Sequence, residues 1–137
     1  MKSRAFLLLL FLLITVKSWS AGLIGKTYED CAAQLGAPAK HVETGAKVIT
    51  DLYTFQQGTW SIEIGFWKGV VHLVSYKRTD GKALTPAETT ALMTGFSDSF
   101  SWAKDTSGSY HRSDGLVKAK PTSSGLTFLS TELARSL

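Results

Sequence analysis

Apolar and polar side chains alternate strictly over residues 59–67, which is the pattern of a strand with one buried face. Two β-rich segments flank this strand, at residues 48–55 and 70–78. Turn residues at 56–58 and 68–69 join the three segments. The pattern therefore predicts a three-stranded antiparallel unit. The apolar residues of its middle strand are Trp60, Ile62, Ile64 and Phe66.

A short helix is predicted ahead of this unit. Thr27 is a good N-cap residue, and two acidic residues follow it in the first turn, where negative charge complements the helix dipole. Cys31 and Leu35 then lie four residues apart and share one face of the helix. Residues 36–38, which read Gly-Ala-Pro, end it.

A second helix start follows the three strands. Residues 85–88 form a capping box, with Pro86 at the first helical position. Leu92 and Phe96 continue the apolar stripe of this helix, and Phe100 would extend it. We therefore expect the helix to pack on the sheet through this stripe.

The C-terminal part predicts three more strands, at residues 109–112, 116–120 and 126–130. The order is helix, three strands, helix, three strands. This order predicts an α+β fold: an antiparallel sheet with short helices packed on one face. The two halves, residues 25–78 and 83–131, suit a tandem αβββ repeat, although chance recurrence of the order explains it equally well.

The N-terminus has the pattern of a secretory signal peptide. Residues 5–16 carry no charge, a short basic stretch precedes them, and small residues at Ser18 and Ser20 fit a signal peptidase site. The uncharged run is too short for a spanning helix, which takes about 20 residues, although an uncleaved anchor is the alternative. We expect cleavage to remove residues 1–20. The remaining single α+β domain, residues 21–137, would be periplasmic or secreted, with no membrane span.

Charge and cysteine content narrow the function. Lys2, Arg4 and Lys17 belong to the predicted signal peptide and supply most of the formal net charge of +4. Because the remainder has no basic run, we expect no nucleic-acid partner. Cys31 is the only cysteine, and the histidines show no ligand spacing. We therefore expect no disulfide, no metal site and no cofactor.

The turns set a register for the first three strands. A two-residue turn at 68–69 would pair Trp67 with Val70, and a three-residue connection at 56–58 would pair Phe55 with Thr59. Paired residues share a face. The residues that would then gather opposite the core are Tyr53, Phe55, Glu63, Trp67, His72 and Tyr76.

Aromatic side chains beside carboxylates suit a protein-recognition surface. We therefore predict that this aromatic face is the binding site. The other interpretation is that the C-terminal strands or a loop cover the face, which would make these aromatic residues a second layer of core.

Two groups offer candidate chemistry. A thiol near a helix N-terminus, as at Cys31, can have a lowered pKa and act as a nucleophile. We expect instead that Cys31 is buried and inert on the apolar side of its helix. Asp51 and Glu63 lie opposite each other in the predicted register and could divide acid and base roles, although paired like charges are also destabilising.

The first half resembles a known family of envelope proteins. The resemblance rests on the Gly25-Lys26-Thr27 helix start, the helix stop at 34–38, and the following positions: Tyr53, Ile62, Ile64, Phe66, Gly69 and Val71. Over roughly residues 25–77 the chain is similar to the SmpA/OmlA (BamE-like) proteins and to the repeats of the β-lactamase-inhibitory protein. The resemblance implies helices on one face of an antiparallel sheet and a role in binding other proteins.

The chain departs from this family in two respects. The lipid-attachment cysteine of the outer-membrane members is missing, and the second half, which contains Trp102, Tyr110 and His111, has no counterpart in the single-repeat members.

These features predict an exported, non-catalytic protein-binding or inhibitor-like module that uses the aromatic face. Its partner would be another exported or envelope protein. Two alternatives remain open: a small exported hydrolase or thiol enzyme, and a structural envelope component that associates with copies of itself through its sheet face.

Overall fold

The computed structural model describes residues 22–137, so the predicted signal peptide lies outside the described residues. The helices are α2 (Tyr28–Leu35), α3 (Pro86–Gly95) and α4 (Thr131–Ser136). The strands of the first half are β1 (Lys40–Glu43), β2 (Asp51–Gln57), β3 (Trp60–Trp67) and β4 (Val70–Arg78). Those of the second half are β5 (Trp102–Lys104), β6 (Tyr110–Arg112), β7 (Val117–Pro121) and β8 (Gly125–Ser130).

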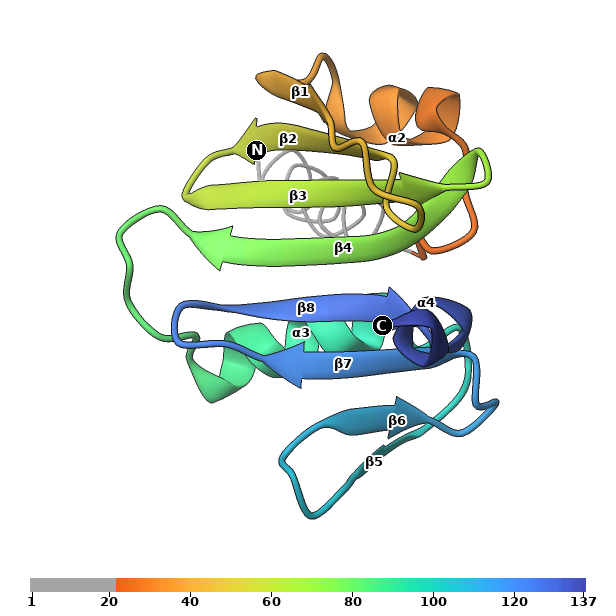
Figure 1. The fold of residues 1–137 in the computed structure, drawn as a ribbon. Coiled ribbons are helices and arrows are strands. Elements are labelled where there is room, and N and C mark those ends of the chain that lie inside the picture. Colours follow the sequence, from red (N-terminus) through yellow and green to blue (C-terminus); the bar gives the residue numbers. More distant parts are fainter. Residues whose placement is uncertain (1–21) are drawn as a thin grey trace, which may run out of the picture.

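The fold is α+β, as predicted. Within residues 22–137, eight strands form one antiparallel sheet in the order β1-β2-β3-β4-β8-β7-β6-β5 (Figure 1). The C-terminal strands therefore extend the sheet at the edge of β4 and do not cover the first three strands. This excludes the interpretation in which they form a second layer over those strands.

Strands β4 and β8 join the two halves of the sheet. Residues 73–77 of β4 pair with residues 125–129 of β8 in antiparallel register. The contact is tight at Gly125, where an added Cβ would lie 1.9 Å from the carbonyl oxygen of Tyr76. Glycine is therefore required at this position for the two halves to meet.

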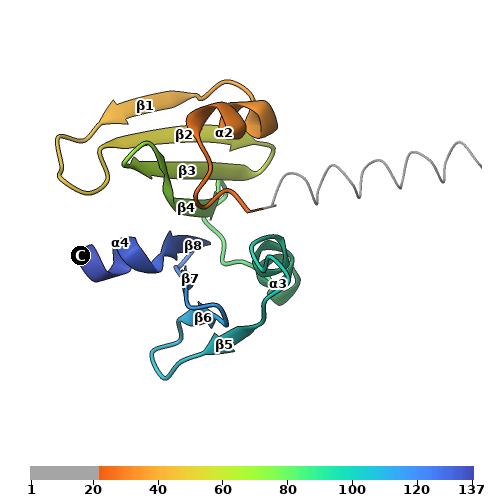
Figure 2. The same cartoon turned by 90° about the vertical axis from the view of Figure 1, so that its right-hand side faces the viewer.

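One face of the sheet carries the main core. Helices α2 and α3 contribute to the same apolar cluster as the inward side chains of the strands. Its fully buried larger members include Phe55, Ile62, Ile64, Val74, Tyr76, Phe96, Leu126 and Phe128. Helix α4 lies on the opposite side of the sheet from α3, near one end (Figure 2). Its Leu133 is buried there.

The two predicted helix starts are confirmed. The Thr27 hydroxyl accepts the backbone N–H of Asp30, and the Asp30 carboxylate accepts the N–H of Thr27. Thr85 and Glu88 form the same reciprocal pair at α3. These bonds satisfy N–H groups that a helix start otherwise leaves without a partner.

The extension of the α3 stripe to Phe100 is wrong. The helix ends at Gly95, and two following residues, Asp98 and Ser99, adopt left-handed backbone conformations. Leu92 and Phe96 are buried, whereas Phe100 is 46% exposed. The chain turns before Phe100 could reach the core.

The β3–β4 turn forms as predicted, but the register beyond it does not. Trp67 pairs with Val70, as expected. Gly65 then pairs with Leu73 and not with His72, because His72 is an extra residue in a β-bulge. The bulge lets both Val71 and Val74 face the core, which strict alternation would not allow.

The β2–β3 connection is shorter than predicted. Gln57 pairs with Trp60, so Gly58 and Thr59 form a two-residue turn. Phe55 consequently pairs with Ile62 and is completely buried. Burying this ring beside Ile62 removes more apolar surface from water than burying the smaller Leu52, which explains the register.

Candidate functional site

The observed register of β2, β3 and β4 separates the residues of the predicted aromatic site. Phe55 and Tyr76 are completely buried in the core, and Tyr53 is half-buried on the α2 side. His72 is buried at the bulge. The prediction of an exposed aromatic face is therefore wrong, because the bulge and the two-residue turn rotate these residues away from solvent. Of the six predicted residues, Glu63 and Trp67 remain on the face opposite the core, by the register of β3.

Tyr53 belongs to a stack beside α2. Its ring lies parallel to the His41 imidazole at a centroid distance of 4.0 Å, and 4.8 Å from the ring of Tyr28. His41 Nε2 lies 2.9 Å from a carboxylate oxygen of Asp51. This hydrogen bond holds the pKa of Asp51 below its usual value.

The predicted Asp51–Glu63 pair does not form. Asp51 lies opposite Phe66, and Glu63 lies between Thr54 and Ser75. Because Asp51 shares a face with the buried side chains and Glu63 does not, the two carboxylates point to opposite sides of the sheet. They cannot act as an acid–base pair.

His72 links the bulge to the start of α4. Its Nδ1 lies 2.7 Å from the hydroxyl oxygen of Ser130, which also accepts the backbone N–H of Leu133. The Ser130 hydroxyl can therefore donate to Nδ1 while it caps the helix. Burial lowers the pKa of His72, and its ring lies 5.0 Å from that of Trp67. This environment gives His72 a structural role.

Cys31 is completely buried in the core, as expected. Burial, with a smaller contribution from Asp30, raises the pKa of the thiol to about 11. The group is therefore protonated near neutral pH, although it lies in the first turns of α2. A raised pKa is the opposite of what a thiol nucleophile needs.

Two rows of polar side chains lie on the sheet face away from α2 and α3, and we call them the open face. The first row crosses β2, β3 and β4: Gln56, Ser61 and Lys77. The second row crosses six neighbouring strands, β1, β2, β3, β4, β8 and β7: Lys40, Thr54, Glu63, Ser75, Thr127 and Lys120. Short hydroxyl side chains occupy the centre, where Ser75 and Thr127 are hydrogen-bonded at 2.9 Å.

The open face carries an excess of positive charge. Lys40, Lys77 and Lys120 are exposed, and Glu63 is its single acidic residue. Within the described part of the chain, none of these three lysines forms an ion pair. No carboxylate of this part of the chain therefore neutralises these three charges by direct contact.

An apolar row borders the open face. Leu52, Gly65, Leu73 and Leu129 are neighbours across β2, β3, β4 and β8. Ile49 covers part of this row, since a Cβ on Gly65 would lie 3.1 Å from its side chain. Helix α4 follows directly from β8 at the same margin.

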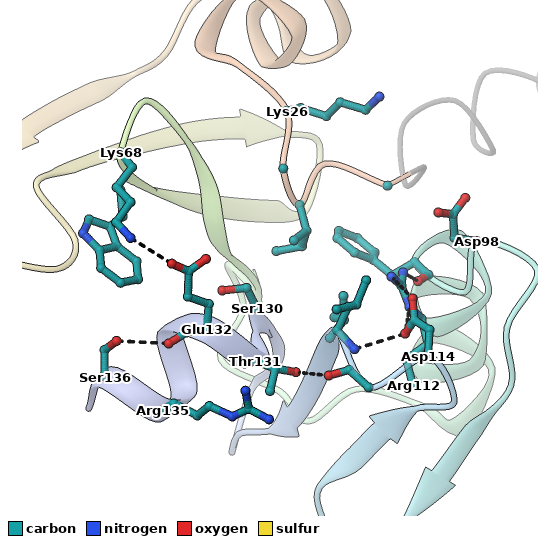
Figure 3. Close-up of a pocket in the computed structure, with 18 residues that line it drawn as sticks. Lys26, Lys68, Asp98, Arg112, Asp114, Ser130, Thr131, Glu132, Arg135 and Ser136 are labelled. Atoms are coloured by element: carbon teal, nitrogen blue, oxygen red, sulfur yellow. Dashed lines mark hydrogen bonds and ion pairs between the residues drawn. The ribbon is translucent and has the colours of Figure 1, made fainter.

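A cavity of about 1070 Å³ lies at one end of the sheet, and we call it the end cleft (Figure 3). Strand β8 ends at Ser130, and Val71 of β4 exchanges two backbone hydrogen bonds with Gly25 and Lys26. The cleft lies between this N-terminal segment, α4 and the β6–β7 turn. Its apolar lining consists of Ile24, Trp67, Phe96, Leu116 and Val117.

Two ion pairs are built into the walls of the end cleft. Lys68 Nζ lies 2.9 Å from the Glu132 carboxylate and 4.3 Å from the centroid of the Trp67 ring. Arg112 lies 2.8 Å from the Asp114 carboxylate and donates to the carbonyl oxygen of Phe96. These contacts hold the β3–β4 turn against α4 and the β6–β7 turn against the end of α3.

A second hollow of about 710 Å³ lies beside α3. It is lined by apolar and hydroxyl side chains, including Met93, Phe100, Trp102 and Tyr110. The Trp102 indole donates to the carbonyl oxygen of Met93. Trp102 and Tyr110 thus lie on the core side of the sheet and leave the open face accessible.

The β5–β6 hairpin contains a second histidine–carboxylate contact. His111 Nε2 lies 2.7 Å from the Asp105 carboxylate, which also accepts from the Ser107 hydroxyl. These bonds lower the pKa of Asp105. Among residues 22–137, no group of three or more His, Cys, Asp and Glu side chains is placed to hold a metal ion. In the same range, no helix combines the length and apolar character that crossing a membrane requires.

No protein-family profile and no protein of curated function matches the chain. Among solved structures, the chain is similar to the crystal structure of a cysteine-rich secretory protein from Staphylococcus aureus subsp. aureus Mu50, at 12% sequence identity and a TM-score of 0.49. The match covers 81% of this chain and 44% of that chain, so this chain spans less than half the length of that protein. A likeness of this size carries no argument about function.

Proposed function

We propose that this chain is an exported, non-catalytic protein-binding module. Its open face would bind an acidic surface of another exported or envelope protein, as an inhibitor-like module does. The observation that carries the proposal is the composition of the open face. Three exposed lysines surround short hydroxyl side chains there. None of the three lysines forms an ion pair within the described residues.

The dimensions of the open face suit a protein partner. Its longer row crosses six strands, which at about 4.8 Å per strand gives a width of about 24 Å. Because an interface of standard size covers about 800 Å² on each partner, the two rows would form the centre of such an interface and not the whole of it. The short side chains of Ser75 and Thr127 leave room for a partner's side chains to reach the sheet.

Charge determines which partner fits best. Complementary charges steer encounter and penalise partners of the wrong sign. Because Lys40, Lys77 and Lys120 outnumber Glu63, the preferred partner has an acidic patch. Binding should therefore weaken as the salt concentration rises.

Export is part of the proposal and rests on the sequence of residues 1–20. The basic start, the uncharged run and the small residues before position 21 have the order of a signal peptide. The resemblance of residues 25–77 to BamE-like proteins and to the β-lactamase-inhibitory protein supports both export and protein binding.

We further infer that the two halves derive from one repeated unit. Helix α2 precedes the consecutive strands β1 to β4, and α3 precedes β5 to β8. Both helices begin with a threonine capping box. The unit would thus contain one helix and four strands, one strand more than the sequence pattern predicts.

The alternatives have less support. The enzyme alternative relied on Cys31 or on the Asp51–Glu63 pair, and the Cys31 thiol is buried while Asp51 and Glu63 lie on opposite faces of the sheet. Self-association of two open faces would bring the lysines of one copy near those of the other, which opposes it.

Charge reversal on the open face tests the proposal. The mature chain and a Lys77→Glu, Lys120→Glu variant would be used to capture proteins from the envelope fraction. The matched control, Lys82→Glu, Lys104→Glu, has the same net charge as the open-face variant. Its two substitutions are at exposed positions outside the open face. We expect one acidic protein to be captured by the wild type and the control and lost with the open-face variant.

Two outcomes would contradict the proposal. A captured protein that both variants retain would bind elsewhere. Capture that nuclease treatment abolishes would indicate a nucleic-acid partner.

A further inference from the structure

The end cleft has features of a ligand site that the open face does not explain. Its volume of about 1070 Å³ lies just above the range of about 300–1,000 Å³ that is usual for small-molecule pockets. Leu116 at its lining is 62% exposed, although the neighbouring Val117 is buried. A bound apolar group would cover this side chain and the half-buried Ile24.

The charges of the cleft do not balance. Its lining contains four cationic side chains, Lys26, Lys68, Arg112 and Arg135, and three acidic ones, Asp98, Asp114 and Glu132. Lys68 and Arg112 are each paired with an acid of the cleft. Among the described residues, Lys26 and Arg135 have no ion pair, which leaves two cations and one carboxylate free.

The two free cations come from different walls. Lys26 belongs to the N-terminal segment and Arg135 to α4, on the other side of the cleft (Figure 3). The accessible apolar residues Ile24 and Leu116 also line the cleft. An arginine fork can hold a carboxylate through two parallel hydrogen bonds, whereas a lysine offers a compact charge.

We propose that the end cleft binds an organic carboxylate with an apolar or aromatic body. The body contacts Ile24 and Leu116, and the carboxylate binds Arg135, with Lys26 adding to the positive potential. Asp98, the remaining free acid, disfavours a ligand with several negative charges. The same chemistry can come from a free organic acid or from an acidic residue next to an apolar one in a peptide.

Amide chemical shifts of the labelled protein, measured during titration, test this inference. The first pair of probes is 3-phenylpropionate and its neutral amide, which differ in charge and not in shape. The second pair is a blocked tetrapeptide that contains phenylalanine followed by aspartate, and its asparagine counterpart. We expect saturable shifts at the cleft residues with a charged probe and much weaker ones with its neutral match. The pair that binds more tightly identifies the source.

Two exposed residues supply the matched variants. Arg135→Gln should weaken binding of the charged probe roughly tenfold, in line with the loss of a charged hydrogen bond, and Lys82→Gln should leave it unchanged. The open-face variant Lys77→Glu, Lys120→Glu should bind as the wild type does, which separates this inference from the proposed function. Equal affinity for both members of each pair, no saturable shift at the cleft, or wild-type binding by Arg135→Gln would each overturn it.

Discussion

At the scale of single residues, burial determines which reactive groups can act. Cys31 lies in the core, and its pKa is raised to about 11. In the unfolded chain the thiol has its ordinary pKa near 8.5, so it forms thiolate roughly two orders of magnitude more readily. We predict that a thiol reagent at pH 8 labels the denatured protein rapidly and the native protein at least about a hundredfold more slowly. Equally fast labelling of both states would contradict this prediction and support the alternative of a thiol enzyme.

His72 makes the stability of the fold depend on pH. Burial is the main cause of its lowered pKa; Glu132 opposes the shift and Lys68 adds to it. The unfolded chain therefore takes up a proton near pH 6.5, before the folded protein does. The stabilising contribution is complete above pH 6.5 and declines as the pH falls from there toward the folded pKa.

This contribution can be isolated by substitution. We predict that the free energy of unfolding, measured in urea, falls less between pH 7 and pH 5 for His72→Gln than for the wild type. His111→Gln, at an exposed position, is the control for removal of a histidine. An unchanged slope in His72→Gln would show that the bulge does not disfavour the charged imidazole.

At the scale of the elements, the β4–β8 pairing is the contact that joins the two halves. We predict that Gly125→Ala destabilises the protein by about 1–3 kcal/mol or more, because the new Cβ would overlap the carbonyl oxygen of Tyr76. Urea unfolding measures the change. Ser123→Ala, in the exposed loop before β8, should stay within about 0.5 kcal/mol of the wild type. Equal stability of the two variants would contradict the observed packing.

The elements that could be predicted have strong local signals. Strand β3 alternates, β4 follows a Lys-Gly turn, and α2 and α3 begin with capping boxes. Strand β1 is exposed along its whole length, and β5 has only three residues, so neither shows an apolar period. Helix α4 has a signal that could have been found, a serine N-cap followed by an acidic first turn.

The register could not be predicted from local signals. The bulge at His72 coincides with a hydrogen bond to Ser130, 58 residues further along the chain. A shift of one residue exchanges the faces of a strand. The predicted aromatic face therefore failed through one unforeseen bulge and one shorter turn.

At the scale of the whole molecule, the open face exists because β8 pairs with β4. Lys40, Lys77 and Lys120 are far apart in the sequence, so they do not form a basic run that could be recognised there. The sheet order places their strands in one surface. A surface assembled in this way depends on the order of the strands in the sheet, so this candidate site could not be predicted from the sequence alone.

The charge of this surface also predicts the oligomeric state. Like charges on two facing copies repel, so we expect residues 21–137 to sediment as a monomer at low salt. Sedimentation velocity over a range of protein concentrations measures this. A concentration-dependent dimer that Lys77→Glu disrupts would instead favour the self-associating alternative.

The central claim is that the open face contacts a partner protein, and site-specific photo-crosslinking tests it most directly. The photoreactive residue p-benzoylphenylalanine would replace Glu63 on the open face or, as reference, the exposed Ala91 on α3. Irradiation of cells that express the full chain should give a discrete adduct with one acidic protein from position 63 and none from position 91. An adduct from position 91 alone, or no adduct from position 63, would contradict the account.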